Sequence, residues 1–145
     1  MPCNKVPAPE FLRLDSGRRI AYREYGPVDG FPTFYFHGTG SNGGAPHLQT
    51  WGTELGLRFV AADRPGFGHS DFQSGRRITD IAHDTASLAD HLGWKRFACV
   101  GVSGGGPYSL ACAALLPESV VRTVCASGIG PPGSPPRGSP AARLS

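Results

Sequence analysis

One stretch of the chain, residues 96–116, reads RFACVGVSGGGPYSLACAALL and decides the fold that we expect. Phe97–Val102 is a short apolar run typical of a buried strand, and Pro107–Leu116 is typical of a helix that begins with proline. Between them, Gly101-Val102-Ser103-Gly104-Gly105 fits the pattern G-x-S-x-G. Such a turn needs glycine two residues before and two after the serine, because the strand and helix backbones crowd each other there. The stretch therefore predicts a strand, a sharp turn that exposes the Ser103 hydroxyl, and a helix.

The composition predicts an ordinary soluble globular domain. Of the 145 residues, 39% are hydrophobic and 17% are charged, which is enough apolar material for a core. The net charge of +3 is small and the basic residues are scattered, so we expect neither nucleic-acid nor membrane-surface binding. No apolar run has the length of a signal-peptide core or a membrane span, which makes the cytoplasm the expected location.

The cysteines favour no disulfide and no metal site. Cys3, Cys99, Cys112 and Cys125 show no C-x-x-C spacing. The last three lie in apolar segments, where we predict that they are small buried side chains. No metal and no organic cofactor is implied.

The first part of the chain predicts a hairpin followed by a strand, a helix and a strand. Phe11–Leu14 and Arg19–Tyr25 flank a turn at Asp15-Ser16-Gly17 and are predicted to pair as a β-hairpin. Thr33–Phe36 and Leu57–Ala62 are predicted strands. A helix from Pro46 to about Leu55 joins them, which implies a right-handed crossover and a parallel pair.

A second helix and a last strand are predicted on either side of the Ser103 stretch. The helix should run to Leu92, with Thr79 as its N-cap and Gly93 just past its end. Its polar face is expected to be solvated and carries His83, Asp84, Ser87 and His91. Val120–Ala126 is a predicted sixth strand. The residues after Gly130 are rich in proline, glycine and serine and are expected to form a disordered tail.

Taken together, these motifs resemble the N-terminal half of an α/β-hydrolase. The decisive ones are the loop His37-Gly38-Thr39-Gly40, the loop Asp63-Arg-Pro-Gly-Phe-Gly-His-Ser70 and the Ser103 turn, in that order. The resemblance implies an α/β fold with a mostly parallel sheet and flanking helices, truncated after about the sixth strand. The domain boundaries expected from it are an N-terminal extension at 1–9, an incomplete core domain at 10–130 and the tail at 131–145.

The resemblance also implies roles for particular residues. Ser103 matches the family's nucleophile, and the backbone N–H of Gly104 matches one oxyanion-hole donor. A second donor would come from the loop after the third strand, where Thr39 is the best candidate and Gly38 shapes the turn. Each such donor can contribute ~3 kcal/mol to acyl transfer. Gly101 and Gly105 would shape the elbow, and His37 would orient its loop rather than carry a proton.

The family's acid and base have no counterpart after Ser103. The triad order in this fold is serine, then an acidic residue, then histidine. Only Glu118 is acidic after Ser103, and it lies in a predicted surface turn. All five histidines precede Ser103. The triad acid and base are therefore unknown from this chain.

Other candidate sites have simpler interpretations. Asp63 and His69 could form an acid–base pair, but their Gly/Pro-rich turn is a structural element of the family. His83 and His91 are too far apart along a helix to bind one metal ion. Trp51 and Trp94 are predicted to pack helices against the sheet. The glycine spacing around Ser103 excludes a dinucleotide-binding loop.

Two functions remain open from the sequence. The first is a serine hydrolase that acts on a small-molecule carbonyl substrate (an ester, thioester or amide) through an acyl-enzyme at Ser103. The second is a catalytically inert fragment that binds or interferes with a full-length relative. In that case Val120–Ala126 would be an exposed sheet edge through which the chain could associate.

Overall fold

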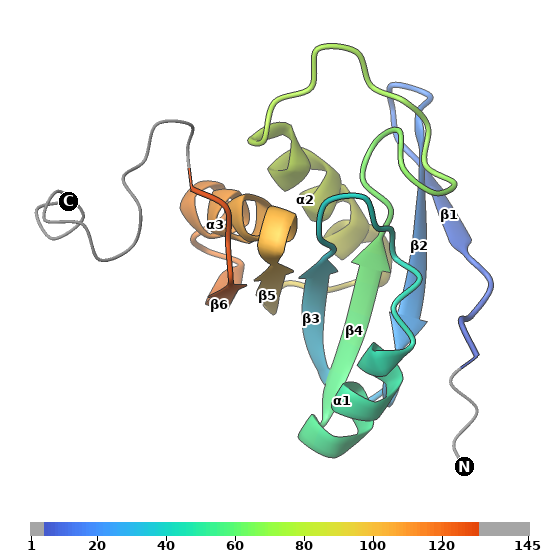
Figure 1. The fold of residues 1–145 in the computed structure, drawn as a ribbon, viewed down its shortest axis with the longest axis vertical. Coiled ribbons are helices and arrows are strands. Elements are labelled where there is room, and N and C mark those ends of the chain that lie inside the picture. Colours follow the sequence, from blue (N-terminus) through green and yellow to red (C-terminus); the bar gives the residue numbers. More distant parts are fainter. Residues whose placement is uncertain (1–4, 131–145) are drawn as a thin grey trace, which may run out of the picture.

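A six-stranded mixed sheet forms the centre of the structure, a computed structural model that describes residues 5–130. The strands lie in the order β1-β2-β4-β3-β5-β6 (Figure 1). Their bounds are β1 Glu10–Arg13, β2 Arg19–Tyr25, β3 Phe31–Phe36, β4 Leu57–Ala62, β5 Phe97–Val102 and β6 Val120–Ala126. The predicted α/β fold with a mostly parallel sheet is confirmed.

The strand pairing follows the predicted hairpin and crossover. β1 and β2 pair antiparallel, and β2 pairs antiparallel with β4. β3 pairs in parallel with both β4 and β5, and β5 pairs in parallel with β6. The carboxyl ends of β3, β4 and β5 therefore lie along one edge of the sheet, which is where open α/β sheets place their sites.

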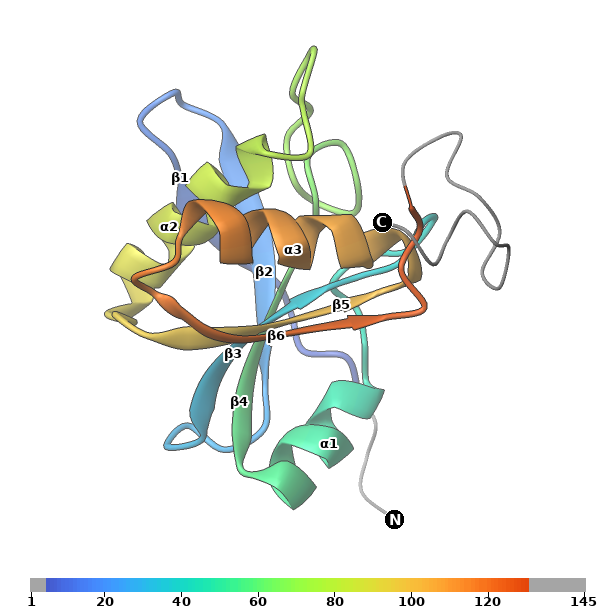
Figure 2. The same cartoon turned by 90° about the vertical axis from the view of Figure 1, so that its left-hand side faces the viewer.

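Helices cover both faces of the sheet. α1 (His47–Leu55) lies on one face, and α2 (Asp80–Leu92) and α3 (Gly106–Leu115) lie on the other (Figure 2). Two apolar clusters hold these layers together. The cluster under α2 and α3 includes Phe34, Val60, Leu88, Phe97 and Cys112. The cluster under α1 includes Tyr25, Tyr35, Leu48 and Phe59.

The predicted ends of α2 are confirmed, whereas the predicted start of β3 was wrong. β3 begins at Phe31 rather than Thr33, because Phe31 and Pro32 already pair with β4. Thr79 is the N-cap residue of α2, as predicted, but its backbone angles are helical, φ −65° and ψ −24°, and its side chain makes no capping hydrogen bond. The helix start is instead tied to the preceding turn, because Oδ2 of Asp80 accepts a 2.8 Å hydrogen bond from the backbone N–H of Arg77.

Three predicted environments were also wrong. Asp84, expected on a solvated face, is buried and forms a 2.5 Å ion pair with Arg18. Trp51, expected to pack at the sheet, is 43% exposed, although Trp94 does pack against Phe34. Cys125, expected to be buried, is exposed because β6 is the last strand of the sheet.

Some sequence predictions lie outside the described residues. These are the environment of Cys3 and the conformation of the tail at 131–145. Within the described part of the chain, no helix combines the length and apolar character needed to cross a bilayer.

Candidate active site

Ser103 stands at a sharp change of backbone direction between β5 and α3. Val102 is extended, with φ −118° and ψ 132°, whereas Ser103 has a φ of +52°. A short 3₁₀ turn, Ser103–Gly105, then leads into α3. Left-handed backbone at a residue other than glycine costs of order 1–3 kcal/mol and is concentrated at functional sites. The strained turn is the conformation expected of a nucleophile elbow.

Gly101 and Gly105 make this turn sterically possible. A Cβ atom on Gly101 would overlap the carbonyl oxygen of Gly105 and lie 2.6 Å from Oγ of Ser109. A Cβ atom on Gly105 would overlap the carbonyl oxygen of Phe36 and lie 2.8 Å from that of His37. The turn is therefore pressed directly against the end of β3.

The loop after β3 brings Gly38 and Thr39 beside the elbow. A Cβ atom on Gly38 would lie 3.6 Å from Cβ of Ser103, which is an ordinary contact distance. A Cβ atom on Gly104 would overlap the Thr39 hydroxyl and lie 2.9 Å from the Thr39 backbone nitrogen. Ser103, Gly104, Gly38 and Thr39 are thus gathered within one small region at the carboxyl edge of the sheet.

His37 is buried and both of its ring nitrogens are engaged. Nδ1 lies 3.0 Å from the carbonyl oxygen of Gly38, and Nε2 accepts a 3.2 Å hydrogen bond from the backbone N–H of Arg64. This arrangement requires the neutral ring with its proton on Nδ1. Burial, together with the nearby charge of Arg64, lowers the pKa of His37 to about 4. His37 therefore organises the loop and has no free nitrogen with which to take a proton from Ser103.

Arg64 ties the loop after β3 to the loop after β4. Its guanidinium group donates hydrogen bonds to the carbonyl oxygens of His37 and Gly38, the latter over 3.1 Å. It also lies 4.6 Å from the ring centroid of Tyr108 on α3. Sequence reasoning quoted this arginine only as part of a loop motif and gave it no role. The sequence could have pointed to a role for Arg64 through its position directly after the apolar strand β4 and Asp63.

Asp63 is a buried structural carboxylate. Oδ1 accepts hydrogen bonds from the backbone N–H of Gly43, at 2.6 Å, and from Arg23, at 3.3 Å. Oδ2 accepts a 2.9 Å hydrogen bond from the backbone N–H of His69, whose ring nitrogen Nδ1 lies 3.8 Å away. These partners hold three segments of the chain together, so Asp63 and His69 lie close to each other as a structural pair.

The remaining histidines contact residues away from Ser103. His47 lies against Tyr35 and Trp51 on the α1 face, and His91 lies against Tyr22. His83 is exposed on α2. Among residues 5–130, no group of three histidine, cysteine or acidic side chains is placed to hold a metal ion.

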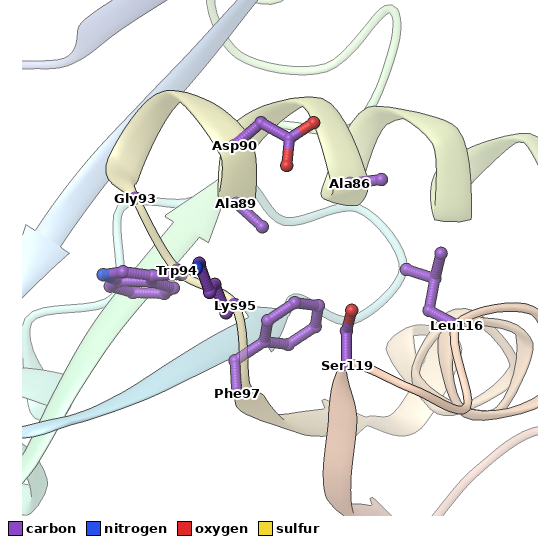
Figure 3. Close-up of a pocket in the computed structure, with 9 residues that line it drawn as sticks. All are labelled: Ala86, Ala89, Asp90, Gly93, Trp94, Lys95, Phe97, Leu116 and Ser119. Carbon is purple, nitrogen blue, oxygen red and sulfur yellow. The ribbon is translucent and has the colours of Figure 1, made fainter.

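A cleft of about 370 Å³ lies away from this region (Figure 3). It is bounded by α2 and by the beginnings of β5 and β6, with Trp94, Phe97 and Ser119 among its lining residues (Figure 3). Phe97 starts β5 and Ser103 follows its end. At about 3.3 Å per residue, the length of the strand separates the two by roughly 20 Å. The cleft therefore does not belong to the Ser103 region.

Comparison with known proteins identifies the family. The sequence model described as alpha/beta hydrolase fold matches residues 28–144. The chain belongs to the α/β-hydrolase family. It is 31% identical over 128 residues to a non-heme chloroperoxidase of Streptomyces lividans, an alignment that spans 83% of this chain and 45% of the relative. It is 29% identical to a bifunctional esterase/perhydrolase of Acinetobacter calcoaceticus, again over 83% and 45% of the two chains.

Solved structures agree with this assignment of the α/β-hydrolase fold. A hypothetical protein from Pseudomonas aeruginosa superposes with a TM-score of 0.69 at 31% identity, over 85% of this chain and 44% of that one. An N-acyl homoserine lactone degrading enzyme superposes with a TM-score of 0.68 at 29% identity, over 79% and 43%. The chain therefore spans slightly less than half the length of these relatives.

Proposed function

We propose that this α/β-hydrolase is a serine hydrolase in which Ser103 attacks the carbonyl carbon of an ester, thioester or amide. The attack would break the C–O, C–S or C–N bond, release the alcohol, thiol or amine with the proton of the serine hydroxyl, and leave an acyl group on Oγ of Ser103 that water then hydrolyses to the free acid. The observation that carries the proposal is the elbow itself, with a φ of +52° at a serine whose Cβ lies beside Gly38. Relatives named as esterase and hydrolase fit this reaction class.

The backbone N–H groups of Gly104 and Thr39 are the proposed oxyanion donors. Gly104 directly follows the serine, and its Cα lies so close to Thr39 that no side chain fits between them. Two fixed donors on either side of one carbonyl oxygen would stabilise the tetrahedral intermediate. The Thr39 loop is braced by Arg64, so the second donor would need no reorganisation during the reaction.

A fluorophosphonate probe tests the proposal, because it reacts with an activated serine and can be located by peptide mass spectrometry. Wild-type protein should be labelled at Ser103, and Ser103→Ala should abolish the labelling. Ser41→Ala is the matched control, since Ser41 is an exposed serine in the neighbouring loop. That variant should be labelled like wild type.

A folded but unlabelled wild-type protein would instead support the second function that we propose, a catalytically inert member of the family. This alternative is favoured by one specific observation, which is that both nitrogens of His37 are already hydrogen-bonded. His37, the histidine of the loop beside the elbow, therefore has no free nitrogen with which to accept the proton of the serine hydroxyl. Near-ultraviolet circular dichroism would establish that the unlabelled protein is folded.

The inert alternative includes association of two copies through β6. Among the described residues, β6 pairs only with β5, and Val124 in its middle is 51% exposed. Such an unpaired edge invites strand addition. Sedimentation equilibrium should reveal association of wild type that is weakened in Val124→Glu. Val28→Glu, at an 80% exposed turn position, should leave it unchanged, and a monomeric wild type would contradict association.

A further inference from the structure

An apolar groove lies beside the proposed oxyanion donors. Its volume is about 590 Å³, which is within the range of small-molecule sites of roughly 300–1,000 Å³. Thr39 and Gly104 line it at one side. Tyr108 and Leu110 of α3, Ile78 before α2 and Ile129 after β6 also line it. We call these six residues the acyl groove.

The side chains of the acyl groove are poorly covered although they are apolar. Leu110 is 52% exposed, Ile78 is 47% exposed and Ile129 is 56% exposed. They come from three separate segments and converge on one hollow. A contiguous apolar surface of this kind on a globular protein marks an interaction site more often than a scattered exposed leucine does. None of the described residues that line the groove is charged.

One wall of the groove is held rigidly. The Arg64 guanidinium group lies 4.6 Å from the Tyr108 ring centroid, and the same group donates a hydrogen bond to the carbonyl oxygen of Gly38. The tyrosine wall and the Thr39 loop are thus attached to one buried side chain. A ligand that contacts both would meet surfaces with a defined spacing, which favours selection by length and polarity.

We infer that the acyl groove binds the acyl part of the substrate, and that this part is apolar, uncharged and longer than a butanoyl group. The inference rests on the proposed function, because the proposed oxyanion donors determine which end of the ligand lies at Thr39 and Gly104. A carbonyl oxygen on the N–H groups of Thr39 and Gly104 leaves the adjoining chain to run between Tyr108, Leu110 and Ile78. A charged chain end would be placed against these side chains and would lose its hydration without gaining a partner.

Three carboxylates serve as probes in a titration of the full chain followed by NMR: butanoate, octanoate and suberate. Each methylene that becomes buried should tighten the dissociation constant about four-fold. Octanoate should therefore bind at least ten-fold more tightly than butanoate even if only two of its additional methylenes are covered. Suberate has the same length but a second carboxylate, and it should bind at least ten-fold more weakly than octanoate. Shifts are expected at the Thr39 and Gly104 amides and at the Leu110 and Ile78 methyl groups.

A pair of variants on one helix provides the control. Leu110→Gln should weaken octanoate binding at least five-fold and weaken butanoate binding less, because fewer methylenes of butanoate reach the groove. Leu115→Gln changes a leucine of nearly equal exposure, 49%, that lies outside the groove, and it should alter neither affinity. Equal affinities for butanoate and octanoate, equal affinities for suberate and octanoate, or shifts confined to the cleft around Trp94 and Phe97 would each overturn the inference.

The two proposals fail in different measurements. Labelling of Ser103 together with binding that does not depend on chain length would contradict the role of the acyl groove and support Ser103 as the nucleophile. Octanoate binding with the expected shifts, together with an unlabelled Ser103, would support the groove as a binding site for apolar acyl chains and contradict the proposed hydrolase reaction.

Discussion

The backbone N–H of Arg64 donates a 3.2 Å hydrogen bond to Nε2 of His37, so the loop after β4 holds the side chain of the loop after β3 in its neutral form. A second hydrogen bond, from Nδ1 to the carbonyl oxygen of Gly38, completes the ring's contacts. This pair of bonds connects two loops that both border the elbow. It makes the shape of the proposed oxyanion hole depend on the protonation state of a buried histidine.

Stability should therefore fall in mildly acidic solution. The pKa of His37 is lowered to about 4, whereas an unfolded histidine titrates near 6.5. Folding favours the neutral form of His37. The contribution of this form to the free energy of unfolding is therefore complete above pH 6.5 and is lost as the pH falls towards 4. The loss should reach about 3 kcal/mol. Urea unfolding at pH 7 and pH 4 measures it.

The histidine responsible is identified by two substitutions. His37→Gln should have a flatter dependence of unfolding free energy on pH between 4 and 7 than wild type. His83→Gln changes an exposed histidine and should keep the wild-type slope. Identical slopes in wild type and His37→Gln would show that His37 is not buried in its neutral form.

The strained elbow predicts that Ser103→Gly stabilises the protein relative to Ser103→Ala. Both variants lack the hydroxyl, but only glycine adopts a φ of +52° without a steric penalty. The difference should be about 1 kcal/mol in favour of glycine, measured by urea unfolding. An alanine variant as stable as the glycine variant would mean that position 103 carries no left-handed strain in solution.

The contact of Gly105 with β3 predicts a large cost for a single methyl group. Gly105→Ala places a Cβ atom on the carbonyl oxygen of Phe36, and we expect a loss of about 3 kcal/mol in the free energy of unfolding. Gly38→Ala is the matched control, because its Cβ would meet Cβ of Ser103 at an ordinary 3.6 Å. Thermal unfolding should show a much lower midpoint for the first variant only.

The buried carboxylate of Asp63 predicts that its neutralisation destabilises the protein far more than neutralisation of an exposed aspartate does. Asp63→Asn removes the charge that pairs with buried Arg23 and leaves an amide opposite the N–H groups of Gly43 or His69. Breaking such a pair typically costs 3–5 kcal/mol. Asp29→Asn changes an exposed aspartate and should have little effect on urea unfolding. Comparable midpoints for the two variants would contradict a structural role for Asp63.

Local patterns predicted most of the fold because they reflect contacts between residues close in sequence. The apolar run Phe97–Val102, the glycines around Ser103 and the Asp15-Ser16-Gly17 turn each act over a few residues. Strand–helix–strand succession then limits the topology, since parallel strands need a crossover of one hand. The same patterns placed Ser103 at a turn, and the resemblance to α/β-hydrolases named Gly38, Thr39 and Gly104 as its neighbours.

What the sequence could not predict depends on residues far apart in the chain. Asp84 lies on a polar helix face by spacing alone, and only the approach of Arg18, 66 positions away, buries it. Cys125 sits in an apolar strand like its neighbours, yet the order of the strands leaves it exposed at an edge. Arg64 gained its role only when folding brought His37, Gly38 and Tyr108 around it.

The sequence by itself determined the family, the succession of strands and helices and the turn at which Ser103 lies, because these follow from backbone sterics and short-range periodicity. The tertiary structure decided which side chains are neutral, charged, buried or exposed around that serine. Burial and electrostatics depend on the sum of all surrounding atoms. For this reason the engaged nitrogens of His37 and the acyl groove emerged only from the folded chain.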